Sequence, residues 1–272
     1  WWGPAGLTGP CGPDSEIFYN TGLPDHPGCR PGCPCGRWLE IWNNVFMEYN
    51  KGADGRYTRL SQRNVDTGMG VERTLMALHE RQDVFTVDTL APLVAEVERL
   101  SGRAYAESPR PFRVIVDHLR AAVFAIADGA LPSNVEAGYV VRRLIRRAVR
   151  YGRELGISRN FCVEVAGVVV DVMGGAYPRL EARWAEAAEA LDREETRFKQ
   201  TLERGLKQVQ KVVERVRADG GQTIGGAEAF DQFETYGFPL PLTVELAAEY
   251  GLAVDETGFS AAYEDHRALS RQ

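Results

Sequence analysis

The sequence predicts an α+β protein in which an antiparallel sheet is followed by a mainly helical domain. Up to residue 88 the chain is dense in glycine, proline and aromatic residues and contains short β-prone runs. From residue 89 onward, apolar residues recur almost everywhere at helical spacing. A length of 272 residues suits one large or two moderate domains. We therefore expect two domains, residues 1–88 and residues 89–272.

The expected strands lie in the first domain. Residues 16–19 and 39–49 are rich in aromatic and β-branched side chains and read as strands of an antiparallel sheet. The pair Asp54-Gly55 follows the second run and suits a hairpin turn. Glycines then precede a helix expected over residues 71–79.

Helical periodicity dominates the second domain. Helices are expected over residues 90–100, 113–127 and 139–155, and two short ones over 242–250 and 259–270. Between them, the stretch from Pro178 to about Ala218 has an apolar residue at every seventh position from Trp184 to Phe198. It predicts one long helix or a helical hairpin, with Gly205 as the candidate bend.

Charge and cysteine content limit the class of protein. A net charge of -6 argues against a protein coated in positive charge, although it leaves room for local basic surfaces. No apolar run approaches the ~20 residues that span a bilayer, and no signal peptide opens the chain. Five cysteines, three of them within seven residues, indicate reduced thiols. We expect a cytoplasmic protein with no membrane partner, and we read both chain ends as cuts because Trp1 opens the chain within what looks like mid-domain sequence.

Five sequence blocks carry the chemistry. They are Thr8–Glu16, Glu40–Tyr49, Val65–Arg73, the turn Pro132–Asn134 that leads into Gly138–Arg150, and Glu234–Pro239. In this order, and over essentially the whole chain, they resemble the alanyl-tRNA synthetases, a family of class II aminoacyl-tRNA synthetases. The resemblance implies that residues 1–88 are the later part of a catalytic domain. It also implies that residues 89–272 recognise a tRNA acceptor stem.

The third block implies a site for ATP and an amino acid. Glycine at positions 68 and 70 lets an adenine ring approach the backbone, which a Cβ would obstruct. By resemblance, Arg73 contacts the ATP γ-phosphate, and Asp66, with Gly68 beside it, binds the ammonium group of alanine. Without the resemblance, Gly68-Met-Gly70 predicts no more than a turn before a helix.

The second block implies a magnesium and phosphate site. By resemblance, Glu40 and Asn43 hold Mg²⁺ and the phosphates of ATP, and Val45 lines the pocket for the alanine methyl group. The alternatives are an ordinary edge-strand carboxylate, a solvent-facing amide and a core valine. The first block departs from the family pattern. Many members have a tryptophan that lies against the bound alanine, and this chain has Gly3 at that position. Trp2, one place earlier, is our candidate for the side chain that lies against alanine.

The helix expected from Tyr139 has a second kind of signal. Its arginines lie opposite an apolar stripe, and the next acidic residue in the sequence is Glu154. Charged helix faces are usually solvated surface, but like charges repel, so an anionic partner is the better explanation. RNA phosphate fits this cluster. The arginines are Arg142, Arg143, Arg146, Arg147 and Arg150.

Two further residues are candidates for reading bases. The family recognises a G·U pair in the acceptor stem, whose guanine 2-amino group faces the accessible minor groove. By resemblance, Glu234 accepts a hydrogen bond from that group and Asn134 bridges the two bases. Glu234 replaces the aspartate that is usual in the family. The alternatives are a helix cap for Asn134 and a surface acid for Glu234. His266, like the other isolated histidines in helical segments, is expected to be structural.

A cysteine-rich insert offers four metal ligands within ten residues. His26, Cys29, Cys33 and Cys35 lie in a loop rich in glycine and proline, with no apolar core of its own. A structural Zn²⁺ would order such a loop. The alternative is a mobile loop with reduced thiols, because the spacing is tighter than the common paired Cys-x₂-Cys arrangement.

The function that the resemblance implies is ATP-dependent activation of alanine to alanyl-adenylate, and transfer of the alanyl group to the 3′ end of tRNA(Ala). We expect the isolated chain to be inactive, because the motif that grips the ATP α-phosphate is not in this sequence. The alternative is a non-catalytic RNA-binding paralogue that binds the acceptor stem. The complete set of Glu40, Asn43, Asp66 and Arg73 argues for the enzyme.

Overall fold

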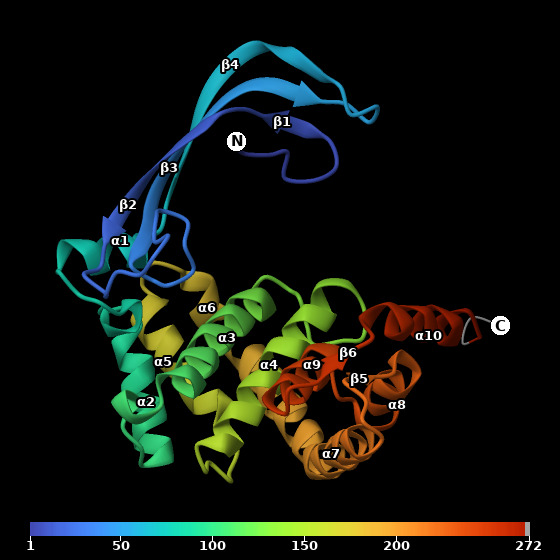
Figure 1. Cartoon of the computed structure of the whole chain (residues 1–272). Helices are drawn as coiled ribbons and strands as arrows, with labels where there is room; N and C mark the ends of the chain where they lie inside the picture. The colour runs from blue at the N-terminus through green and yellow to red at the C-terminus, as the bar shows by residue number, and fades with distance from the viewer. Residues whose placement is uncertain (270–272) are drawn as a thin grey trace. The chain divides into compact units, whose positions relative to one another are not determined.

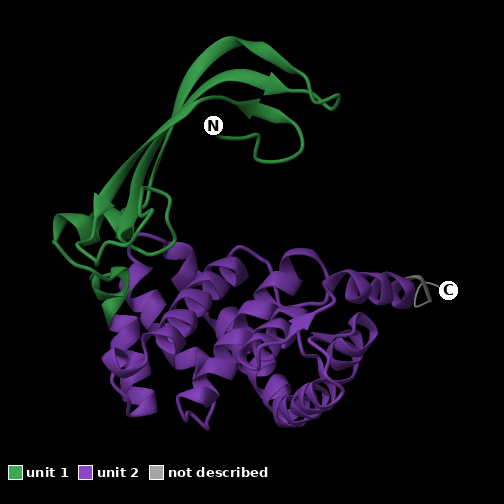
Figure 2. Cartoon of the chain, in the orientation of Figure 1, with its two compact units in different colours: residues 1–91 green, residues 92–272 purple. Residues whose placement is uncertain are grey.

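The computed structural model describes residues 1–269 and divides the chain into two compact units. The first comprises residues 1–91 and the second begins at Pro92 (Figure 2). The first unit holds an antiparallel sheet and the second is almost wholly helical. This confirms the α+β class predicted from the sequence.

The first unit is a four-stranded antiparallel sheet built around β3 (Figure 1). β1 and β2 pair with opposite ends of one edge of β3, and β4 pairs along its other edge. The strands are β1 (Gly9–Cys11), β2 (Asp14–Asn20), β3 (Trp38–Lys51) and β4 (Tyr57–Met69). The short helices α1 (Val71–Leu78) and η1 (Val84–Thr86) follow them.

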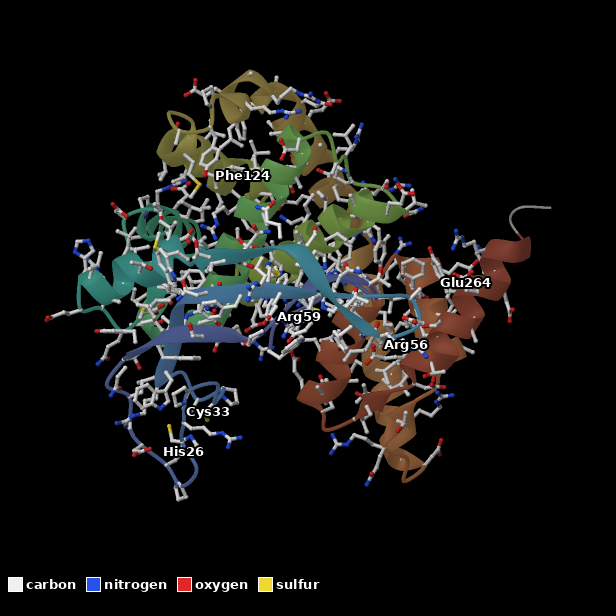
Figure 3. The ribbon with its side chains drawn as sticks, turned by 90° about the horizontal axis from the view of Figure 1, so that it is seen from above. His26, Cys33, Arg56, Arg59, Phe124 and Glu264 are labelled. Carbon is white, nitrogen blue, oxygen red and sulfur yellow. The ribbon has the colours of Figure 1, made fainter. Side chains whose placement is uncertain are left out.

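The strand expected over residues 39–49 lies within β3 and has the two-residue period of a pleated strand. Val45 and Met47 are buried, whereas Phe46 between them is 44% exposed. β3 and β4 form the predicted hairpin, in which Gly52 N donates to Arg56 O at 2.9 Å and Gly55 has a φ of +78°. Figure 3 labels Arg56 at the tip of this hairpin.

The second unit contains most of the helices. They are α2 (Ala91–Ser101), η2 (Tyr105–Glu107), α3 (Pro109–Ala127), α4 (Glu136–Glu154), α5 (Cys162–Met173), α6 (Pro178–Ala182), α7 (Trp184–Ala218), α8 (Gly226–Tyr236), α9 (Leu240–Glu249) and α10 (Glu256–Leu269). α3 and α4 pack side by side, and α7 packs against both. Fully buried side chains such as Phe112, Ile145 and Phe198 from these three helices form the core.

The helices expected from periodicity are confirmed. The stretch from Pro178 begins with the short helix α6, and one long helix follows from Trp184. α7 runs unbroken over 35 residues. A Cβ at Gly205 would lie 2.6 Å from Cδ2 of the buried Phe238, so this glycine permits close packing. For the last expected helix, Ser270 lies outside the described residues.

Two α-helices and a small sheet were not predicted. α5 and α8 lie outside the expected helical ranges, and β5 (Thr223–Ile224) pairs in parallel with β6 (Ala253–Val254). These two-residue strands are too short to leave a pattern in the sequence. Among the described residues, no helix combines the length and apolar character required to cross a membrane.

Candidate active site and nucleic-acid interface

The spacing of Glu40 and Asn43 conflicts with a regular strand. Two residues three positions apart would point to opposite faces of a sheet. Ile17 of β2 lies opposite Trp42, but Phe18 lies opposite Glu40, so Ile41 is an extra residue in β3. This β-bulge shifts the alternation by one residue. It therefore brings the Glu40 and Asn43 side chains to the same face.

β4 adds its residues to that face. Gly68 lies opposite Asn43, and Asp66 lies opposite Val45. Directly opposed residues of an antiparallel pair point the same way. A Cβ at Gly68 would lie 2.8 Å from Oδ1 of Asn43, which agrees with this assignment. The structure thus gathers all five predicted residues of β3 and β4 on one face.

β2 contributes two carboxylates that the sequence reading did not single out. Asp14 lies opposite Val45 and Glu16 lies opposite Asn43, so both share the same face. Slight desolvation, followed by the charges of Glu40 and Asp14, raises the pKa of the exposed Glu16. Carboxylate oxygens are the protein ligands that Mg²⁺ prefers. Only the strand register reveals these two residues, because their spacing from Glu40 carries no signal.

Arg73 is anchored beside the bulge. Its Nη1 donates to the main-chain oxygen of Glu40 at 3.1 Å, and the neighbouring Gly70 N donates to Ile41 O at 3.2 Å. A Cβ at Gly70 would lie 3.1 Å from Cδ of Arg73, so glycine makes room for the arginine stem. The side chain is exposed, and its remaining N–H groups can donate to an anion.

Val45 and Trp2, the two residues expected to line the alanine pocket, lie in different parts of the first unit. Val45 is only 3% exposed and lies between Asp14 and Asp66 in the sheet. Trp2 forms an isolated antiparallel bridge with Gly12, with hydrogen bonds of 2.9 and 3.1 Å. A Cβ at Gly12 would lie 1.8 Å from the carbonyl oxygen of Phe46, so this close approach requires glycine. The bridge ties the Trp2 segment to β3 one residue from Val45.

The expectation that the arginines of α4 lack acidic partners is wrong, because the partners come from distant helices. Arg142 and Arg146 donate from Nε to Glu194 of α7 at 3.1 and 2.6 Å. Arg146 is only 3% exposed, donates to the main-chain oxygen of Gly237 and lies over the ring of Phe198. Burial lowers the pKa of Arg146 to about 10, so it stays cationic at neutral pH. These two arginines bind α7 to α4.

The C-terminal arginines of the same helix bind α9. Arg147 Nη2 lies 3.0 Å from Oε1 of Glu245, and Arg150 Nη1 lies 3.5 Å from its Oε2. Tyr151 also donates to Glu245, and Arg150 pairs with Glu249. This part of the predicted RNA face is therefore an internal ion-pair network, and its charge has a structural explanation.

Arg143 stands apart from the other four arginines. Within the described part of the chain, no ion pair or hydrogen bond involves its side chain. It is half-buried and lines two cavities, of about 700 and 330 Å³. Its guanidinium is therefore available to an anionic ligand.

The smaller of these cavities brings Asn134 and Glu234 together. They line it with Arg142, Arg143 and His266, although they come from separate segments of the chain. Asn134 is exposed and does not cap α4, whose first turn follows Val135 without a side-chain cap. Glu234 is paired with Nδ1 of His266 at 3.1 Å, so this histidine of α10 belongs to the candidate site.

The turn that presents Asn134 is tightly held. Ser133 N donates to Gly138 O at 3.0 Å, and Ser133 Oγ donates to Val135 O at 3.0 Å. A Cβ at Gly138 would lie 2.2 Å from Ser133 Oγ, so the turn can fold over α4 only where glycine stands. Glu136 has a φ of +50°, a left-handed conformation that is uncommon for a residue other than glycine.

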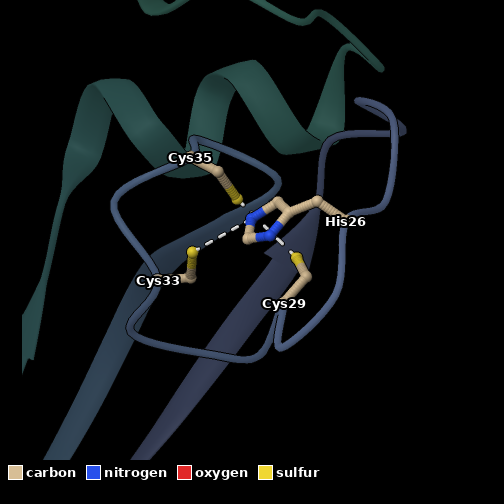
Figure 4. A group of neighbouring side chains, drawn as sticks. All are labelled: His26, Cys29, Cys33 and Cys35. Atoms are coloured by element: carbon tan, nitrogen blue, oxygen red, sulfur yellow. Dashed lines mark hydrogen bonds between the residues drawn. The ribbon is translucent and has the colours of Figure 1, made fainter.

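The cysteine-rich loop brings its four candidate ligands together. The ligand atoms of His26, Cys29, Cys33 and Cys35 lie within 4.8 Å of one another, and their side chains point to a common centre (Figure 4). The backbone N–H of Arg37, together with His26, lowers the pKa of the Cys35 thiol to about 6. A thiolate is the form of cysteine that binds metals.

Comparison with known proteins places this geometry in a family. The family model described as tRNA synthetases class II (A) matches residues 1–272. This chain belongs to the class II (A) tRNA synthetases. It is 46% identical to the alanine–tRNA ligase of Treponema pallidum (strain Nichols), over 100% of this chain and 46% of that protein. It is 44% identical to the alanine–tRNA ligase of Dehalococcoides mccartyi (strain ATCC BAA-2266 / KCTC 15142 / 195), over 99% of this chain and 31% of that protein. The chain thus spans less than half of these relatives.

Proposed function

We propose that this chain carries the ATP and alanine site and the acceptor-stem site of an alanine–tRNA ligase. The observation that supports this best is the bulge at Ile41, which gives Glu40 and Asn43 the same face as Asp66 and Gly68. A sheet that served only as scaffold would have no need to align two carboxylates, an amide and a glycine in this way. The similarity to alanine–tRNA ligases supports the same assignment.

In the first step, each side chain has a separate role. Asp66 pairs with the ammonium group of alanine, while Val45 and Trp2 surround its methyl group. Gly68 and Gly70 admit the adenine ring, and Arg73 donates to the γ-phosphate. The alanine carboxylate oxygen attacks the α-phosphate, an acyl–phosphate bond forms, and pyrophosphate leaves. The protein acts here mainly by positioning and charge.

Magnesium would bind on the acidic side of this face. Glu40 and Asn43, with Glu16 nearby, would hold it together with the ATP phosphates. Bound there, the ion would neutralise the charge that builds on the departing pyrophosphate. Zinc, the third cofactor expected from the sequence, would act outside the reaction as a structural ion in the loop between β2 and β3.

In the second step, a 3′-terminal ribose hydroxyl of tRNA(Ala) attacks the alanyl carbonyl, an ester forms and AMP leaves. The cavity lined by Asn134 and Glu234 would hold the G·U pair of the acceptor stem. Glu234 accepts a hydrogen bond from the guanine 2-amino group, and Arg143 supplies a phosphate contact. We propose a cytoplasmic location for this function, because translation takes place there.

The amino-acid site is tested by alanine-dependent ATP–pyrophosphate exchange. The assay uses a chimera in which this chain replaces the aligned segment of the Treponema pallidum relative. Asp66→Asn should raise the KM for alanine about 10- to 150-fold, because it removes a charged hydrogen bond. Asp88→Asn, at an exposed carboxylate of the same unit, is the matched control. A chimera that folds and binds RNA but gives no exchange would favour the non-catalytic paralogue. We also propose that the isolated chain gives no exchange.

The acceptor-stem site is tested on the chain itself with an RNA hairpin that carries the G·U pair. Glu234→Gln and Asn134→Ala should each weaken binding by about 1–3 kcal/mol and reduce the preference for G·U over G·C. Glu264→Gln, an exposed glutamate of α10, is the control. Equal affinity of all variants for both hairpins would contradict the assignment.

A further inference from the structure

We propose that His26, Cys29, Cys33 and Cys35 form a tetrahedral Zn²⁺ site that orders the loop between β2 and β3. Figure 3 shows His26 and Cys33 in the same loop, and Figure 4 shows the sulfur atoms arranged around the imidazole. None of the five cysteines forms a disulfide. The three thiols of this loop therefore remain available as ligands.

Two distances within the cluster are close to the edges of a zinc tetrahedron. With Zn–S bonds of ~2.3 Å and a Zn–N bond of ~2.05 Å, two sulfurs lie about 3.8 Å apart, and sulfur and nitrogen about 3.6 Å apart. Sγ of Cys29 lies 3.7 Å from Sγ of Cys35, and Sγ of Cys33 lies 3.3 Å from Nε2 of His26. Three soft sulfurs and one imidazole suit Zn²⁺ and exclude the oxygen-seeking ions Mg²⁺ and Ca²⁺.

Two consecutive turns of the same type present the ligands. Residues 26–29 and 30–33 both have proline second, glycine third and cysteine fourth. In each, the cysteine N–H donates to the carbonyl oxygen of the first residue at 2.9 Å. Gly28 and Gly32 have φ values of +81° and +84°, as a type II turn requires at its third position. Local sequence thus brings His26, Cys29 and Cys33 together before any metal binds.

The loop has little else to hold it. His26 and Cys35 are exposed, and Cys29 and Cys33 are only half-buried, so no apolar core forms around them. At the neck, where the two ends of the loop meet, Thr21 N donates to Arg37 O at 2.9 Å, and Arg37 Nη1 donates to Leu23 O at 2.8 Å. A zinc ion would cross-link the remainder, as it does in small domains without a core.

The ion would also affect the active face. β3 begins at Trp38, directly after the neck, and Glu40 and the Ile41 bulge follow within three residues. A disordered loop would let this end of β3 fray from β2. The effect on Glu40 rests on the function proposed above, whereas zinc binding and strand order do not.

The site is tested by elemental analysis of the 272-residue chain purified without chelators. About one zinc per chain is expected in the unsubstituted protein and in Arg30→Ser, which changes an exposed residue that is not a ligand. Cys33→Ser should lose most of the metal. Cobalt substitution gives a second reading, because the sulfur-to-cobalt absorption should weaken in Cys33→Ser and persist in Arg30→Ser. A folded chain that carries no zinc, or variants with equal zinc content, would overturn the proposal.

Hydrogen exchange separates the metal site from the enzyme assignment. After zinc is removed from the unsubstituted chain by a chelator, amide exchange over residues 38–41 should accelerate, while exchange over residues 50–57, at the other end of the hairpin, should not change. Unchanged protection over residues 38–41 would overturn the ordering role. Failure of pyrophosphate exchange in the chimera would leave both results standing, since neither measures catalysis.

Discussion

Glu245 of α9 should be among the most important single carboxylates for the stability of the helical unit. Its side chain is only 10% exposed and lies 2.8 Å from Arg110 Nη2 and 3.0 Å from Arg147 Nη2. Burial alone would raise its pKa. The hydrogen bonds from Arg147 and Tyr151, together with the arginine charges, outweigh burial and lower the pKa from 4.5 to about 2.

The pKa shift of Glu245 sets how much its ionised carboxylate contributes to the free energy of unfolding. At ~1.4 kcal/mol per pKa unit, the shift corresponds to ~3 kcal/mol, which partial solvent screening reduces to about 2 kcal/mol. Because the folded-state pKa is the lower one, this stabilisation is present above about pH 4.5 and is lost as the pH falls toward 2. Glu245→Gln should therefore cost about 2 kcal/mol at pH 7, or ~4–8 °C in Tm, and less than half of that at pH 3.

Urea unfolding followed by helical circular dichroism measures this difference. Glu249→Gln is the matched control, since Glu249 lies one turn further along α9, is 44% exposed and pairs with Arg150. It should cost less than ~1 kcal/mol, because the Glu249 carboxylate is exposed and Arg150 keeps Glu245 as a partner. The reasoning fails if the two variants lose equal stability at pH 7, or if the loss in Glu245→Gln is the same at pH 3 as at pH 7.

Three further predictions concern α4. Gly152→Ala should destabilise the helical unit by about 1–3 kcal/mol, because its Cβ would lie 2.3 Å from Cε1 of the buried Phe161. Gly175→Ala, whose Cβ would meet nothing within 4 Å, should leave urea unfolding unchanged. Arg146→Ala should cost about 1–3 kcal/mol of stability, because it removes the closer of the two arginines that pair with the buried Glu194. Arg143→Ala should keep stability, weaken RNA binding and reduce the slope of its salt dependence by about one. If Arg143→Ala lost stability and Arg146→Ala only weakened RNA binding, the division of α4 into structural and RNA-binding arginines would be refuted.

Sequence alone determined what depends on neighbouring residues. Helical periodicity predicted α3, α4 and α7, and Asp54-Gly55 predicted the β3–β4 hairpin, because turn chemistry and amphipathic spacing act over a few residues. The motif blocks led to the family that the comparison then established. The cysteine spacing was likewise sufficient to nominate the four candidate ligands.

The tertiary structure decided what depends on long-range contacts. In a regular strand, Glu40 and Asn43 would lie on opposite faces, and only the register of β2 against β3 reveals the bulge that aligns them. Spacing made the α4 arginines look unpaired, because Glu194 and Glu245 reach them from helices far along the chain. Asn134 and Glu234 meet in one cavity for the same reason. Strand register and helix packing are set by the whole core, so a local pattern can nominate a residue but cannot identify the partners it meets.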